Sequence, residues 1–132
     1  MQKTIQIAKV TLADMFDIDV NNFEVHVTRK IAVVEARRFL IYFLVRELGI
    51  KFLHIKKYMP ALTNHASAIH HFNKLDELMT IYPLIKAKYK KFKETMMVQG
   101  LEKLEIELNK QMNLKRTIEI NIHTLKTLIN ES

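Results

Sequence analysis

The chain has 132 residues, of which 48% are hydrophobic, and its net charge is +7; this composition predicts a single hydrophobic core and argues against disorder. The absence of cysteine excludes a disulfide framework, a thiol nucleophile and a cysteine zinc site. Two glycines and two prolines are few for this length, which favours an all-α helical bundle over a turn-rich sandwich or barrel.

Two helices are predicted in the first part of the chain. Residues 2–17 carry apolar residues at helical spacing, and the turn-forming residues at 17–22 end that helix. Residues 31–48 are apolar on nearly every side, which is typical of a central, buried helix, and Gly49 ends it. Five charged residues within 31–48 exclude an ordinary membrane span, so no membrane partner is expected.

A short helix and a longer one are predicted next. The short helix covers residues 50–59 and is ended by Pro60, because the residue before a proline is disfavoured in the α region. Thr63 or Asn64 then caps a helix that runs to about Tyr82. Pro83 suits the first turn of a further helix, whose five lysines within 86–93 form either a solvated face or a phosphate contact.

The last part of the chain predicts a long amphipathic helix. Apolar residues from Leu101 to Ile129 follow a 3-4 spacing that is typical of a coiled coil, interrupted by Gln111 and Lys115. Residues 117–124 alternate in polarity and are also compatible with a strand; we predict helix. The chain is therefore divided into a domain at 1–93 and a helical extension at 94–132, which we expect to form a homodimer.

The positive charge is concentrated in the middle of the chain. Residues 29–93 contain fourteen lysines and arginines against four acidic residues, a net charge of +10. Residues 1–28 have a net charge of −2, and residues 94–132 have a net charge of −1. This excess predicts a polyanionic partner for the middle segment, whereas charge alone leaves a solvated lysine-rich surface as the alternative.

The two helices around Pro60 have the layout of a helix-turn-helix. A reading helix enters the DNA major groove with its N-terminus first, so its first turn needs hydrogen-bonding and small side chains. Asn64, His65 and Ser67 supply donors and acceptors there, and alanines separate them. Spacing alone leaves open the alternative of a capped helix in an ordinary bundle.

Four short motifs follow one another between residues 29 and 75. They are Arg29-Lys30, Ala36-Arg37-Arg38, Val45-Arg46-Glu47-Leu48 and the segment from Thr63-Asn64-His65-Ala66-Ser67-Ala68 to Lys74-Leu75, with a histidine at His70. With these motifs, residues 5–92 resemble the C-terminal DNA-binding domain of the bacterial replication initiator DnaA. The resemblance implies a Trp-repressor-like helix-turn-helix fold. The Thr63, Asn64 and Ala66 positions depart from the family's Arg, Asp and Thr, so a different DNA site is expected.

The resemblance also implies roles for individual residues. His65 and Ser67 are implied base readers, with Asn64 beside them in the signature. Arg29 or Lys30 is the candidate for the minor groove. Phosphate contacts are expected from Arg37, Arg38, Lys56 and Lys57. The complete set of expected DNA-binding residues is Arg29, Lys30, Arg37, Arg38, Lys56, Lys57, Thr63, Asn64, His65, Ser67, His70 and Lys74.

Enzymatic chemistry is not predicted. The chain has no phosphate-binding G-x-x-x-x-G-K-[ST] loop, which separates it from the ATPase part of DnaA. Its six histidines include no pair four residues apart and no H-E-x-x-H motif, so neither a metal nor another cofactor is expected. Of the adjacent His70 and His71, one is expected to be buried and the other to lie at the surface.

The expected function is sequence-specific binding of double-stranded DNA, in replication initiation or transcription control, by a stand-alone protein of the kind that phages and mobile elements encode. The alternative is a protein-interaction adaptor that keeps the fold without specific DNA reading. The N-terminal sequence lacks the pattern of a signal peptide, so a cytoplasmic or nucleoid-associated location is expected.

Overall fold

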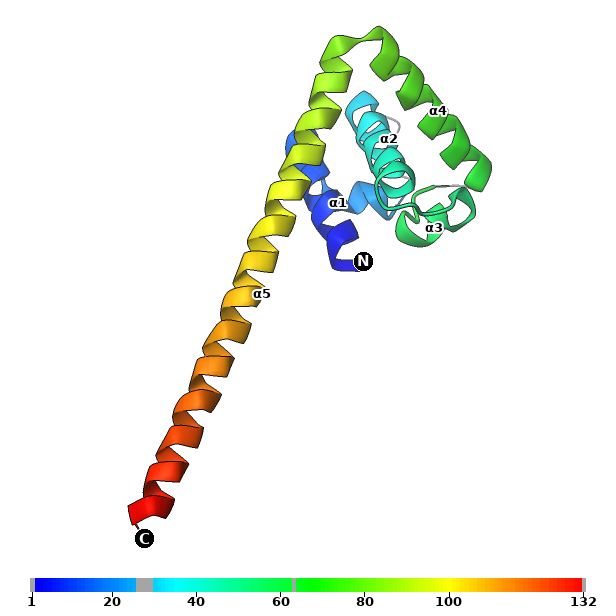
Figure 1. The fold of residues 1–132 in the computed structure, drawn as a ribbon. Coiled ribbons are helices and arrows are strands. Elements are labelled where there is room, and N and C mark those ends of the chain that lie inside the picture. Colours follow the sequence, from blue (N-terminus) through cyan, green and yellow to red (C-terminus); the bar gives the residue numbers. More distant parts are fainter. Residues whose placement is uncertain (1, 26–29, 63, 132) are drawn as a thin grey trace. The chain divides into compact units, whose positions relative to one another are not determined.

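The computed structural model describes residues 2–25, 30–62 and 64–131, and their side chains except those of 102–104, 125 and 127–131. Every regular element within these ranges is a helix, which confirms the all-α prediction for the described part of the chain (Figure 1). The elements are α1 (Gln2–Phe16), η1 (Val20–Phe23), α2 (Ile31–Arg46), η2 (Phe52–His54), α3 (Ile55–Tyr58), α4 (His65–Ile81) and α5 (Pro83–Glu131). The chain divides into two compact units, unit 1 at residues 1–96 and unit 2 at residues 97–132.

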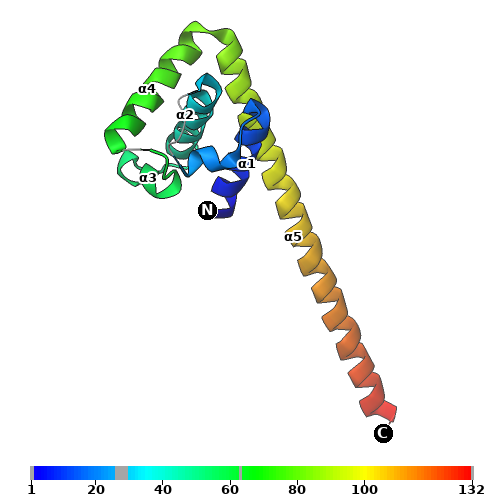
Figure 2. The same ribbon diagram turned by 180° about the vertical axis from the view of Figure 1, so that it is seen from behind.

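Helix α2 is the centre of unit 1. It contacts both α1 and α4 (Figures 1 and 2). Eight of its side chains, including five consecutive ones at 40–44, are buried apolar groups. Such a helix gains most of its stability from burial on all sides rather than from propensity, because isolated helices of this length are marginal in water.

Aromatic side chains join α2 to its neighbours. Phe39 meets Phe16 of α1 edge to face, with ring centroids 5.1 Å apart, and Tyr42 stacks on Phe72 of α4 at 4.7 Å. Tyr89, in the part of α5 that belongs to unit 1, lies 5.0 Å from Tyr42. Such pairs contribute beyond their buried area and fix the relative placement of the helices.

Helices α1 and α2 end in left-handed residues. Asp17 follows α1 with φ +52°, and Gly49 follows α2 with φ +67°. The Ile50 amide donates to the Leu44 carbonyl at 2.9 Å, which satisfies an end group of α2. The predicted breaks at 17–22 and at Gly49 are confirmed.

The segment before Pro60 differs from its prediction. Residues 50–59 are predicted to form one short helix, whereas the structure has a 3₁₀ turn, η2, followed by the single α turn of α3. Ile55 and Met59 are completely buried and hold this segment to the core. Their burial decides the local geometry, because so short a helix is not stable by itself.

The last segment is helical. Residues 117–124 lie within α5, as predicted, although their polarity also fits a strand. In the described part of the chain, no helix is both long and apolar enough to cross a membrane.

Candidate nucleic-acid interface

Asn64 caps α4. Its backbone is extended (φ −161°, ψ 172°), and its side-chain Oδ1 accepts a hydrogen bond from the Ser67 amide at 2.9 Å. A short polar residue is favoured here because it satisfies an amide that has no partner within the helix. Of the two predicted caps, Asn64 is the one observed, and Thr63 lies outside the described residues.

The exposed face of α4 divides into two halves. Its first half presents His65, Ala66, Ile69, His70 and Asn73, with no acidic residue among them. Its second half presents the acidic pair at 76–77. An anionic partner is therefore favoured at the beginning of α4, where the helix dipole is also positive.

Ile69 and Asn73 belong to this face but are not among the predicted DNA-binding residues. They lie four and eight residues after His65, and that spacing is the signal that places all three on one side of the helix. The predicted reader Ser67 and the predicted contact Lys74 are half-buried, so they lie nearer the core than His65 does.

Lys56 and Lys57 lie on α3, which immediately precedes the connector to α4. Both are exposed, whereas Ile55 of the same turn is buried. α3 and η2 both contact α4, and Phe52 of η2 meets Phe72 of α4 edge to face at 5.4 Å. The two lysines are thus positioned by the packing of α3 and η2 against α4.

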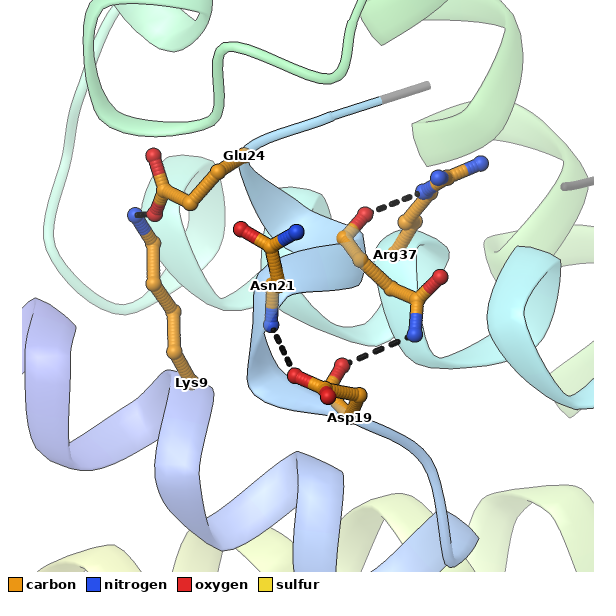
Figure 3. Close-up of polar contacts among 6 residues, drawn as sticks. Lys9, Asp19, Asn21, Glu24 and Arg37 are labelled. Atoms are coloured by element: carbon orange, nitrogen blue, oxygen red, sulfur yellow. Dashed lines mark hydrogen bonds and ion pairs between the residues drawn. The ribbon is translucent and has the colours of Figure 1, made fainter. Parts of the chain in front are cut away.

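Arg37 lies in the interior and holds the loop that precedes α2 (Figure 3). Its guanidinium donates to the Asn22 carbonyl at 2.9 Å through Nε and to the Val25 carbonyl at 3.2 Å through Nη2. Only 6% of the residue is exposed, and burial lowers the pKa of its guanidinium. Its place differs from the surface position that a phosphate contact would need.

The rest of that loop is held by side chains of its own and of α1 (Figure 3). Asp19 caps η1 by accepting from the Asn21 amide at 2.8 Å. Lys9 of α1 pairs with Glu24 across 2.6 Å. These contacts hold residues 19–25 to α1 and α2. Arg29 lies outside the described residues, and Lys30 is exposed just before α2.

Arg38 and His71 form a hydrogen bond between α2 and α4. The Arg38 Nε donates to the His71 Nδ1 at 3.2 Å, so this histidine accepts through Nδ1 and is neutral. Burial first, and then the charges of Arg38, His70 and Arg37, lower the pKa of His71 from 6.5 to about 4. His70 lies at the surface, as expected for one of the two histidines. His71 is half-buried, whereas the other histidine was expected to be buried.

Two of the five lysines in the first part of α5 contact other groups of the protein. Lys88 lies over the Phe16 ring, with its Nζ 3.8 Å from the ring centroid, and Lys93 pairs with Glu47 at 3.3 Å. Both contacts join α5 to the core of unit 1. The other three lysines of the run are exposed: Lys86, Lys90 and Lys91.

Comparison of the sequence with protein-family models finds no matching family, and comparison with curated proteins finds no matching protein.

Proposed function

We propose that unit 1 binds double-stranded DNA, with the first half of α4 reading base edges in the major groove. The observation that carries this proposal is the exposed, acid-free start of α4, adjacent in the chain to the exposed Lys56 and Lys57 of α3. Small and polar side chains there permit close approach to the bases, and the lysines supply cations for phosphates. The net charge of +10 on residues 29–93 supports the same partner.

The roles of the individual side chains follow from their positions. His65, at the first turn of α4, hydrogen-bonds a base edge, and His70, one turn further along, meets a base or a phosphate. Lys56 and Lys57 contact phosphates, and Lys30 is a candidate for the minor groove. Asn64 contributes through its cap, which fixes the first turn of the reading helix.

The acidic pair at 76–77 supports a direction of entry. Carboxylates facing DNA phosphates are repelled, so the second half of α4 stays away from the duplex while its N-terminus enters the groove. In this proposal α3, the connector and α4 act as a helix-turn-helix. The resemblance to the DnaA C-terminal domain supports a role in replication initiation or transcription control.

Binding to duplex DNA over a range of salt concentrations tests the proposal. With about six phosphate contacts, log K should fall with log salt at a slope of about −5. Selection from a random duplex pool should return a preferred sequence for the full chain. The absence of binding at low salt would contradict the proposal and favour the adaptor, for which the exposed Ile31 and Leu53 of unit 1 supply an apolar surface.

Three substitutions separate reading from anchoring. His65→Ala should relax the preference for one sequence, whereas Lys57→Ala should weaken binding to all sequences alike and reduce the salt slope by about 1. Lys110→Ala, which removes an exposed lysine from unit 2, is the matched control and should change neither. If His65→Ala and Lys57→Ala act identically, the base-reading role of His65 is wrong.

A further inference from the structure

The part of α5 in unit 2 presents a line of apolar side chains to solvent. From Gly100 onward every described side chain is exposed, including Leu101 (63%), Leu108 (61%) and Ile118 (50%). A helix of this length with so many exposed large apolar groups is stabilised when a partner covers them.

The heptad register of the apolar residues is the same before and after the polar residues Gln111 and Lys115. Leu101 and Leu108 are one heptad apart, and Ile118 follows Leu108 by one heptad and three residues, so all three are seam positions of the same coiled coil. The interrupting Gln111 and Lys115 also fall on the seam. A single partner helix can therefore cover the apolar residues on both sides of Gln111 and Lys115.

We propose that this segment pairs with the same segment of a second copy as an antiparallel, two-stranded coiled coil centred on Asn113. In this register Leu108 faces Ile118 of the second copy, and Gln111 faces Lys115 of the second copy. The sequence continues the pattern outward, because Leu101 and Leu104 align with Leu125 and Ile122. Every apolar seam position thus meets an apolar one.

The polar residues decide the orientation. A parallel pair would place Lys115 against Lys115 in the seam, with like charges opposed. The antiparallel pair places the Lys115 ammonium against the Gln111 side chain, whose amide oxygen accepts from it. The two-fold symmetry of the pair gives two such layers, and polar layers set the register of coiled coils.

The residues beside the seam favour the same orientation. Met112 meets Met112, and Leu114 meets Leu114, on the two sides of the centre, and both residues are exposed in the single chain. Glu105 faces Glu119 at the edge, where solvent screens the repulsion. Ile106 and Ile120 lie on the outer face and stay uncovered.

The area and the charge suit a second copy. The seam of each chain has eight apolar positions: 97, 101, 104, 108, 118, 122, 125 and 129. At roughly 60–120 Å² each, they bury about 1,000–2,000 Å² in the pair, which is the range of stable interfaces. Residues 94–132 carry a net charge of −1, so this segment brings two copies together without the repulsion of the basic middle segment.

Disulfide trapping tests the register, because the natural chain has no cysteine. Leu108→Cys and Ile118→Cys chains are mixed, allowed to exchange and oxidised. The expected product is the mixed disulfide, with the full chain sedimenting at twice 15.6 kDa. The matched control mixes Ile106→Cys with Ile120→Cys, which have the same register on the outer face and should not cross-link.

Three results would overturn the proposal. A Leu108→Cys chain that cross-links mainly to itself indicates a parallel pair. A mass that stays at 15.6 kDa at all concentrations excludes self-association, and a tetramer excludes the two-stranded coil. Circular dichroism of each variant verifies that α5 remains helical, so that a missing cross-link is attributable to geometry.

Discussion

His71 and Arg38 show how one hydrogen bond makes a residue of α4 sensitive to pH. The His71 Nδ1 accepts from the Arg38 guanidinium, and protonation of that nitrogen would replace the acceptor by a donor beside a positive charge. The lowered pKa of His71 has burial as its first cause and this charge as its second. The folded protein therefore favours neutral His71.

We expect the free energy of unfolding to fall as the pH is lowered from 6.5 to about 4. In that window the unfolded chain binds a proton at His71 that the folded chain does not, so stability is present above pH 6.5 and is lost toward pH 4. A fully buried group would lose about 3 kcal/mol, and the partial exposure of His71 reduces the loss to roughly 1–2 kcal/mol. Urea unfolding at several pH values measures it.

His71→Asn is the control for this prediction. The asparagine keeps an acceptor near the Arg38 guanidinium and does not titrate, so its stability should depend less on pH between 4 and 6.5 than that of the natural chain. Equal pH dependence in the two proteins would show that His71 is not the responsible group.

At the scale of the element, α4 depends on its cap. Asn64→Ala removes the acceptor for the Ser67 amide, so we expect a loss of about 1 kcal/mol in the free energy of unfolding. Asn64→Asp keeps an acceptor and suits the helix dipole, so it should be close to neutral for stability. The same substitution adds a negative charge at the proposed interface.

Two measurements on the same variants therefore separate the two roles of this position. Unfolding should distinguish Asn64→Ala from the natural chain, and selection from a random duplex pool should return a different preferred sequence for Asn64→Asp. An unchanged preferred sequence for Asn64→Asp would show that position 64 does not approach the bases.

Local signals in the sequence predict most of these elements. Asn64, Gly49 and Pro83 act through the backbone of their own few residues, and each stands at the helix end where it is predicted. The division of residues 50–59 into η2 and α3 is not predicted, because it depends on the burial of Ile55 and Met59 against distant residues. The same limit applies to the exposed face at the start of α4, because the sequence does not show that Ser67 lies closer to the core than Ile69 and Asn73 do.

At the scale of the whole molecule, the two proposals together predict a coupling between pairing and DNA binding. Leu108→Glu places a charge in the seam and should give a monomer. A duplex of about 40 base pairs is longer than the coiled coil, which is about 50 Å long. On such a duplex we expect the natural dimer to bind DNA through two copies of unit 1. The monomer should bind more weakly, with about half the salt slope.

Ile106→Glu is the matched control, since it adds the same charge on the outer face of the coil. It should leave both the dimer and the salt slope unchanged. The natural chain could be dimeric and Leu108→Glu monomeric, and yet both could show the same slope of log K against log salt. That result would show that a single copy of unit 1 contacts the duplex.

The sequence by itself determined the long helices, the concentration of positive charge in residues 29–93 and the regular spacing of the apolar residues in the C-terminal helix. These depend on spacing and on local backbone chemistry. Only the tertiary structure decided which of two adjacent residues lies inside: Arg37 holds the loop carbonyls while Arg38 reaches His71, and His71 is half-buried while His70 is exposed. Adjacent residues of a helix point about 100° apart, so the helices that pack on each side determine their surroundings.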